Sequence, residues 1–231
     1  TVAQFHLSVN CAPRDSRWGG VGHVRKTVME NFHHIHNSVR DPGLASQLDR
    51  LEQWSRRQLE ILAPVIDERK ALGFVRECHG DMHLRNIALW KNDIIIFDCL
   101  EFNEGLRFID VISEIAFLLM DLEARELEPQ AMCFLNTYLQ ITGDYDGLRL
   151  LGFYKVYRAL VRAKVDILRS QQERHGSEEY AQTVDEFYRY LGLAKKYTRS
   201  SSPLLLITHG VSGTGKSTAA GALAEKISAI Q

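Results

Sequence analysis

Several features of specialised protein classes are missing from this sequence. No apolar stretch approaches the roughly 20 residues that a membrane-spanning helix needs, and the first residues show no pattern typical of a secretory signal. The net charge of −1 provides no bulk attraction to nucleic acid or to an anionic membrane. The four cysteines form no Cys-x-x-Cys pair and have no histidine at zinc-site spacing. We therefore expect a cytoplasmic protein with reduced thiols, and neither nucleic acid nor a membrane as its partner.

The composition is that of an ordinary globular protein, with 45% hydrophobic and 25% charged residues in a chain of 231. A chain of this length can form one large domain or two small ones. It begins at Thr1 and ends at Gln231, within a stretch that reads as a helix. We expect it to be a segment of a longer protein.

Hydrophobic periodicity predicts that most of the chain is helical. Asp41-Pro42-Gly43 reads as a break between helices, and Pro64 as a kink or as the start of a further helix. Asp110 suits an N-cap, and Phe74–Cys78 reads as a short strand. The segments with apolar residues at helical spacing are 24–39, 44–62, 110–122, 129–141, 148–169 and 178–197.

The most informative polar residues are His79-Gly80-Asp81, followed by Asn86 and Asp98. Phosphoryl transfer needs a carboxylate that orients the acceptor hydroxyl, and oxygen ligands that hold Mg²⁺ against the phosphates of a nucleotide. Asp81 suits the first role, whereas Asn86 and Asp98 suit the second. Gly80 permits a backbone conformation that other residues resist. His79 joins Asp81 as a catalytic candidate, with an imidazole that can brace the loop.

Two strand candidates lie between the expected magnesium ligands. Ile87–Trp90 and Ile94–Phe97 are apolar, and the turn-like Lys91-Asn92-Asp93 separates them. A hairpin of these strands brings Asn86 and Asp98 to the same end, close enough to share one ion. The alternative interpretation is an ordinary polar turn before a strand, which the longer pattern disfavours.

Longer motifs surround these residues. Cys78-His79-Gly80-Asp81-Met82-His83-Leu84-Arg85-Asn86-Ile87 and Ile96-Phe97-Asp98 form the central part, and Phe102-Asn103-Glu104, Arg107–Asp110 and Tyr157–Lys164 extend it. In these motifs the chain resembles the aminoglycoside phosphotransferase-like branch of the protein-kinase-like superfamily. It is similar to the bacterial group in which such a domain is fused to a P-loop ATP-binding domain.

The resemblance implies roles for the residues that match it. Asp81 corresponds to the catalytic aspartate, Asn86 and Asp98 correspond to the magnesium ligands, and Asp110 is implied as a structural support. Residues 1–198 are implied to form the mostly helical C-lobe of a kinase fold. The N-lobe of the family, with its phosphate-covering loop and ATP-contacting lysine, has no counterpart in the sequence. We therefore expect the chain alone to lack kinase activity.

A second motif lies near the end of the chain. Residues 210–217 match the phosphate-binding pattern G-x-x-x-x-G-K-[ST]. Leu204–Ile207 before it reads as a buried parallel strand, and Ala219 to Ile230 reads as a helix. Lys216 is expected to reach the β- and γ-phosphates of ATP, and Ser217 to hold magnesium. The candidate nucleotide-binding residues are Gly210, Gly213, Thr214, Gly215, Lys216, Ser217 and Thr218.

The polar residues 199–203 read as a linker between units 1–198 and 204–231. Because only one strand and one helix follow the linker, we expect the P-loop unit to be incomplete and not to function by itself. The predicted fold class is α+β: a mostly helical kinase-like C-lobe with a catalytic β-hairpin, followed by the first βα unit of a P-loop domain.

The predicted function is ATP-dependent transfer of the γ-phosphate to a hydroxyl of a small molecule, with Mg²⁺ as the second cofactor. The alternative is a P-loop ATPase or small-molecule kinase in which the kinase-like lobe is a regulatory module or scaffold. A third interpretation is an inactive chain that has kept the motifs of its ancestors. The acidic residues after Asp98 suit a pocket for a cationic substrate or, more commonly, a solvated helix face; they are Glu101, Glu104, Asp121, Glu123, Glu126 and Glu128.

Overall fold

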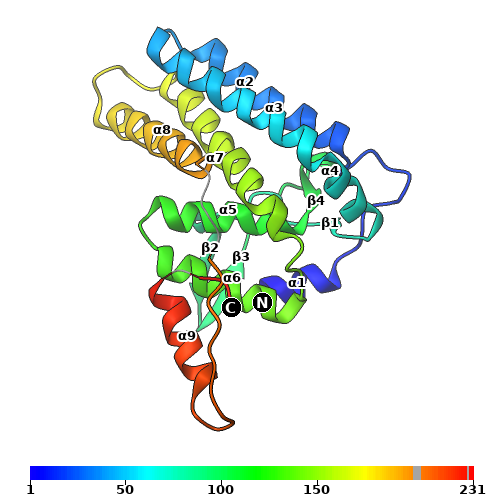
Figure 1. The fold of residues 1–231 in the computed structure, drawn as a ribbon. Helices are drawn as coiled ribbons and strands as arrows, with labels where there is room; N and C mark the ends of the chain where they lie inside the picture. Colours follow the sequence, from blue (N-terminus) through cyan, green and yellow to red (C-terminus); the bar gives the residue numbers. More distant parts are fainter. Residues whose placement is uncertain (200–203, 228) are drawn as a thin grey trace.

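The computed structural model describes residues 1–199, 204–227 and 229–231, so most of the expected linker lies outside the described residues. The described chain is mostly helical, with two antiparallel sheets of two short strands each, which agrees with an α+β composition (Figure 1). The helices are α1 (Val2–Ser8), α2 (Val21–Ser38), α3 (Pro42–Ala71), α4 (Glu104–Arg107), α5 (Val111–Ala124), α6 (Glu128–Thr142), α7 (Leu148–Ser170), α8 (Glu178–Tyr197) and α9 (Lys216–Lys226). The strands are β1 (Val75–Glu77), β2 (Ile87–Trp90), β3 (Asp93–Ile96) and β4 (Phe108–Asp110).

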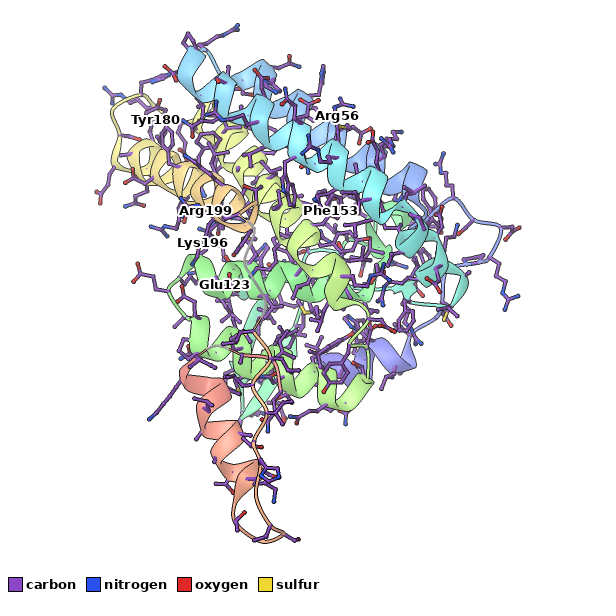
Figure 2. All side chains as sticks on the ribbon, viewed as in Figure 1. Arg56, Glu123, Phe153, Tyr180, Lys196 and Arg199 are labelled. Atoms are coloured by element: carbon purple, nitrogen blue, oxygen red, sulfur yellow. The ribbon has the colours of Figure 1, made fainter. Side chains whose placement is uncertain are left out.

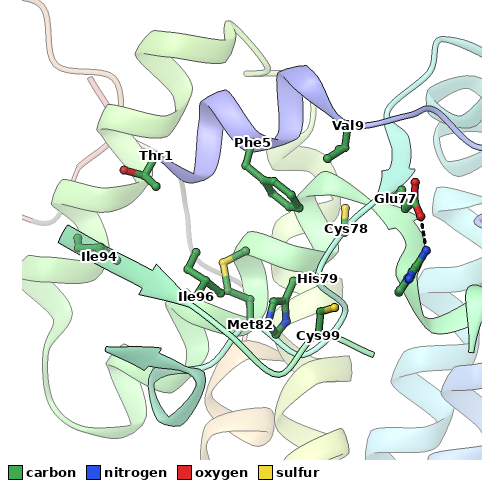
Figure 3. A pocket seen from close by; sticks show the side chains of 11 residues that line it. Thr1, Phe5, Val9, Glu77, Cys78, His79, Met82, Ile94, Ile96 and Cys99 are labelled. Carbon is green, nitrogen blue, oxygen red and sulfur yellow. Dashed lines mark hydrogen bonds and ion pairs between the residues drawn. The ribbon is translucent and has the colours of Figure 1, made fainter. Parts of the chain in front are cut away.

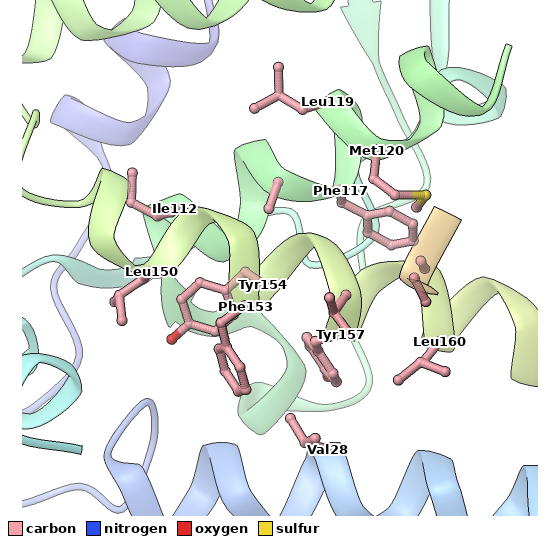
Figure 4. Close-up of a cluster of buried hydrophobic side chains, with 14 of the residues drawn as sticks. Val28, Ile112, Phe117, Leu119, Met120, Leu150, Phe153, Tyr154, Tyr157 and Leu160 are labelled. Atoms are coloured by element: carbon pink, nitrogen blue, oxygen red, sulfur yellow. The ribbon is translucent and has the colours of Figure 1, made fainter. Parts of the chain in front are cut away.

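Helix α5 forms the centre of the helical body. Nearly all of its side chains are buried, as its almost continuous apolar sequence requires. Helix α7 packs against α5 and α8, while α2 and α3 pack as a pair against α7 (Figure 1). Side chains of α5 and α7, such as Phe117 and Tyr154, form this core with Val28 of α2 (Figure 4). Figure 2 contrasts the buried Phe153 of α7 with the exposed Arg56 of α3.

Strands β2 and β3 confirm the predicted hairpin. Ile87 pairs with Ile96, and Trp90 pairs with Asp93. Lys91 and Asn92 have positive φ angles of 49° and 67°, the left-handed conformation that two-residue hairpin turns require. The predicted strand before His79 is also present, because β1 pairs with β4 and joins the start of the loop that carries His79 and Asp81 to the start of α5.

Helix α3 corrects one expectation. The Asp-Pro-Gly break marks its beginning, since the Asp41 side chain accepts a hydrogen bond from the Leu44 amide and Pro42 occupies the first turn, where it needs no donor. Pro64 lies inside this single helix, so the expectation of a second helix starting there is wrong. Leu59 and Ile66 on either side of the proline are buried in the core, and this packing offsets the lost helical hydrogen bond.

The predicted strand Leu204–Ile207 is wrong, because the structure assigns no strand to these residues. Their exposed fractions lie between 52% and 82%. A buried parallel strand needs neighbouring strands, and residues 204–227 and 229–231 contain none. The helix that follows begins at Lys216, earlier than expected, and packs against α6. Among the described helices, none is both long and apolar enough to span a membrane.

Candidate active site

The loop between β1 and β2 holds the first three candidate residues. Gly80 has a φ angle of +86°, and a Cβ atom at this position would lie 2.7 Å from the carbonyl oxygen of Leu106. Both the backbone angle and the close approach exclude a side chain here. This explains in physical terms why glycine stands between His79 and Asp81.

Asp81 lies at the surface end of the loop, with its side chain 31% exposed. The Asn86 amide nitrogen donates to the Asp81 carbonyl oxygen at 3.0 Å and to its carboxylate Oδ2 at 3.1 Å. His83 Nε2 lies 3.3 Å from the same oxygen. Burial alone would raise the pKa of Asp81, but His83 and the positive charges of Arg158 and Arg162 lower it. The carboxylate is therefore ionised at neutral pH and held in place.

The hairpin brings Asn86 and Asp98 to one end, as predicted. Asn86 directly precedes β2, and the Phe97 amide donates to the Asn86 carbonyl oxygen at 3.0 Å. Asp98 is the next residue after Phe97, so its main chain lies next to that of Asn86. The side-chain nitrogen of Asn86 is used by Asp81, which leaves its Oδ1 without a hydrogen bond from any described residue. Asp98 is exposed and has a φ angle of +61°, an uncommon conformation for a residue other than glycine. One amide oxygen and one exposed carboxylate form a donor set that fits Mg²⁺.

His79 braces the loop with both ring nitrogens. Its Nε2 donates to the Phe97 carbonyl oxygen at 2.7 Å, and its Nδ1 accepts from the Asp81 amide at 3.3 Å. The ring thereby joins the loop that carries Asp81 to the segment that carries Asp98. With both nitrogens engaged, His79 is a positioning residue for the two carboxylates.

Glu114 of α5 is a central residue that the sequence analysis missed. It is fully buried, and its two carboxylate oxygens accept hydrogen bonds from the amides of His79 at 2.5 Å and Gly80 at 2.8 Å. Burial opposes ionisation, but His6, Arg158 and the His79 amide together lower the pKa of Glu114. The available signal was an acidic residue within the apolar first part of α5, since such a residue is buried only when it is paired.

Arg158 of α7 supports the loop from the other side. Its Nη1 donates to the carbonyl oxygen of Gly80, and its Nε donates to that of Ser113, both at 3.1 Å. The guanidinium also lies 4.9 Å from the ring centre of Phe117. Helices α5 and α7 thus hold the peptide groups next to Asp81 through one acidic and one basic side chain.

Three buried side chains behind the loop resemble a soft-metal site. Ligand atoms of His6, Cys78 and Glu114 lie within 4.8 Å of one another. However, both oxygens of Glu114 already accept amide hydrogen bonds, and burial next to this carboxylate raises the pKa of the Cys78 thiol. A protonated thiol and an occupied carboxylate are poor metal ligands, so the cluster has a structural role.

A pocket of about 450 Å³ lies beside the catalytic loop (Figure 3). It is bounded by Phe5 of α1, by His79 and Met82 of the loop, and by Ile94 and Ile96 of β3. Its walls are mainly apolar, and none of Asp81, Asn86 and Asp98 lines it. The pocket therefore lies on the inner face of the hairpin, away from these three polar side chains.

The P-loop residues have the local conformation of their motif, but no strand precedes them in residues 204–209. Gly213 and Gly215 have φ angles of +81° and +74°, and α9 begins at Lys216. The Lys216 ammonium donates to the Val211 carbonyl oxygen at 2.6 Å, while Ser217 is exposed. Helix α9 packs against α6, so the structure does not bring this loop together with Asp81.

Comparison with known proteins adds relatives but no assigned activity. Curated proteins from Mycobacterium bovis and from two strains of Mycobacterium tuberculosis are each 30% identical to the chain over 228 residues, and all three are named only as uncharacterized. The match covers 99% of this chain and 45% of each relative. The chain therefore spans about half the length of the curated relatives that it matches. No protein-family model matches the chain, and no solved structure does.

Proposed function

We propose that the chain carries the catalytic and magnesium-binding part of an ATP-dependent phosphotransferase that acts on a hydroxyl of a small molecule. The observation that supports this most is the arrangement of Asp81, Asn86 and Asp98. The Asn86 side-chain nitrogen donates to the Asp81 carboxylate, and the Asn86 main chain pairs with Phe97, the residue before Asp98. One residue thus connects the group that orients the acceptor with the group that binds the ion.

In this proposal Asp81 accepts the hydrogen bond of the acceptor hydroxyl and holds its oxygen in line with the γ-phosphate. Its ionised state at neutral pH suits this role. Asn86 Oδ1 and a carboxylate oxygen of Asp98 would hold Mg²⁺, which when bound offsets the charge on the phosphates. His79 keeps the distance between the two carboxylates constant, because one ring binds both segments.

The outer face of the hairpin offers a surface for the nucleotide base. Strand alternation places Ala88, Ile95 and Phe97 on one face, all three exposed. This face carries Asn86 at one end, so a base stacked on it would direct its phosphates toward the magnesium ligands. Apolar walls with a few polar groups at one end are typical of nucleotide sites.

A second candidate is ATP binding by the P-loop, with the helical lobe as a scaffold or regulatory module. The left-handed glycines before α9 favour it, because successive amides in this conformation form a nest for phosphate. The exposure of Leu204–Ile207 weighs against it within this chain.

The test is ATP turnover by the protein at its full length, measured with a panel of small alcohols. We expect Asp81→Asn to lower turnover by about 10² or more, because it removes the carboxylate that orients the hydroxyl. Asp98→Ala should weaken calorimetric binding of Mg²⁺–ATP at least tenfold, because it removes a ligand oxygen. Asp93→Asn is the matched control, since Asp93 is an exposed carboxylate at the other end of the hairpin.

Two results separate the candidates. Full turnover in Asp81→Asn, together with its loss in Lys216→Ala, would contradict the first proposal and support the P-loop. Loss in Asp81→Asn with little change in Lys216→Ala would support the first.

A further inference from the structure

Arg162 of α7 is buried without the partners that a guanidinium normally has. Only 7% of the residue is exposed. Its Nε is enclosed and has no hydrogen-bond partner among the described residues, and the Tyr190 hydroxyl is the neutral group that interacts with the guanidinium. The nearest carboxylate oxygen is Asp166 Oδ1, 3.8 Å from Nη2, and the other oxygen of Asp166 is unpaired as well. Leaving a buried charged donor unpaired is costly, so an acceptor group is expected at this position.

The position of Arg162 relates it to the catalytic carboxylate. Arg158 and Arg162 are one helical turn apart and share a face of α7. Arg158 donates to the carbonyl oxygen of Gly80, directly before Asp81. The positive charges of both arginines contribute to the lowered pKa of Asp81. The Arg162 guanidinium therefore lies on the side of Asp81 that α7 covers.

Two of the three carboxylates near Arg162 are paired with other groups. Glu186 is paired with Arg85 at 2.6 Å. Asp121 accepts from the Leu84 amide and from the Tyr190 hydroxyl, both at 2.9 Å. Burial raises the pKa of Asp166 to about 6, so it is mostly ionised at neutral pH. It is the carboxylate nearest to Arg162, at 3.8 Å, and its Oδ2 has no partner among the described residues.

The acidic residues that suggested a cationic substrate are either paired with other groups or exposed. Glu123 is bound by Lys155 and by the Tyr197 hydroxyl, and Asp121 is buried in the contacts given above. Glu101, Glu104 and Glu126 are exposed. None of these contacts forms an acidic pocket at Asp81 among the residues described. The charged side chains that act on the Asp81 carboxylate are His83, Arg158 and Arg162.

We propose that Arg162 binds the acceptor, and that the acceptor alcohol carries an anionic group, a carboxylate or a phosphate. This inference rests on the proposed phosphotransferase function and names its substrate class. Arg162 is fixed for such a role, because its guanidinium lies 5.5 Å from the ring centre of Tyr190 and 3.8 Å from Asp166. A planar guanidinium in this setting can donate two parallel hydrogen bonds to one oxyanion. The anionic group would anchor the molecule while its hydroxyl meets Asp81.

The first test uses inorganic phosphate as a probe of the anion site. In the full-length protein, NMR signals of the arginine Nε–Hε groups should show a saturable shift of Arg162 on addition of phosphate, with Arg169 unchanged. Arg162→Met should weaken calorimetric phosphate binding about tenfold or more, and Arg162→Lys should restore part of it. Arg169→Met is the control, because Arg169 is on the same helix but exposed and paired with Glu173.

The second test compares acceptors that differ only in charge. With Mg²⁺–ATP, glycerate should stimulate ADP release more than glycerol does, and Arg162→Met should raise the KM for glycerate with a smaller effect on kcat. A phosphate titration that leaves the Arg162 signal unshifted would overturn the proposal and leave hydration as the partner of this side chain. Faster ADP release with glycerol, or with the cationic glucosamine, than with glycerate would also overturn the proposal. Failure of Asp98→Ala to affect Mg²⁺–ATP binding would instead count against the phosphotransferase function alone.

Discussion

Glu114 shows how one buried carboxylate can hold a catalytic loop. Its oxygens accept from two consecutive amides, those of His79 and Gly80, immediately before Asp81. His6 Nε2 lies 3.7 Å from the same carboxylate, and His6 Nδ1 is 2.9 Å from the Tyr138 hydroxyl. These contacts connect α1, α5 and α6 to the loop. The position of Asp81 therefore depends on a buried residue of another element.

We predict that Glu114→Gln destabilises the protein by about 1–3 kcal/mol at neutral pH. The amide offers one acceptor oxygen where two backbone N–H groups need one each, so one buried donor is left unpaired. Urea unfolding at pH 7 measures the effect. Glu60→Gln is the control, because Glu60 is exposed on α3.

The effect of Glu114 should depend on pH in a defined direction. Its folded pKa is lowered from an ordinary value of 4.5, so its contribution to stability is fully present above that value. As the pH falls through the lower folded pKa, the contribution disappears. The difference in unfolding free energy between wild type and Glu114→Gln should therefore shrink in strong acid. A difference that is unchanged there would show that Glu114 does not act through its charge.

At the scale of elements, Arg69 joins helices that are distant in sequence. From α3 it donates to both oxygens of Asp110, at 2.7 and 3.0 Å, and to both oxygens of Asp144, at 2.6 and 2.7 Å. Asp110 also caps α5 through the Ile112 amide at 2.8 Å, which confirms its predicted N-cap position. One guanidinium thus links α3, the start of α5 and the loop between α6 and α7.

We predict that Arg69→Met destabilises the protein by about 3–5 kcal/mol, because two buried carboxylates lose their shared partner. Chemical denaturation at neutral pH measures this loss. In contrast, Arg56→Met should cost no more than about 0.5 kcal/mol, since Arg56 makes an exposed ion pair with Glu52 on the same helix. Equal effects of the two substitutions would contradict the role assigned to Arg69.

At the scale of the whole molecule, residues 1–199 contain nearly all of the packed core. Contacts of the C-terminal segment with this body are few and mostly polar. Asn136 of α6 binds the Ala229 carbonyl oxygen at 3.0 Å and the Gln231 amide at 2.9 Å, and the Tyr145 hydroxyl donates to Gln231 at 3.2 Å. Such contacts contribute little to the stability of a body with its own core.

We predict that a chain ending at residue 199 folds as well as the 231-residue chain. Its melting temperature, measured by circular dichroism, should differ by less than about 2 °C, because little apolar surface is uncovered. Failure of the shorter chain to fold would show that residues 204–231 are part of the same cooperative unit. It would also contradict the predicted boundary at 199–203.

Local patterns in the sequence determined the secondary structure of the first 199 residues to a large extent. Periodic apolar residues predicted α5, α6, α7 and α8, because a helix buries one face and the spacing of that face is visible in the chain. The hairpin and the placement of Asn86 and Asp98 followed from two short apolar runs around a turn, since a tight turn leaves one register. The candidate site could be predicted because its residues lie within twenty positions of each other.

Tertiary structure alone decided the residues that support this site. Glu114 and Arg158 reach the catalytic loop from α5 and α7, and no local pattern indicates which loop a buried charge will meet. Packing kept α3 continuous across Pro64, whereas Leu204–Ile207 remained exposed without neighbouring strands. The arginines near Asp81 and the unsatisfied Nε of Arg162 also appeared only in the folded chain. Apolar spacing is a property of one segment, but a charge acquires its partner only when distant segments meet.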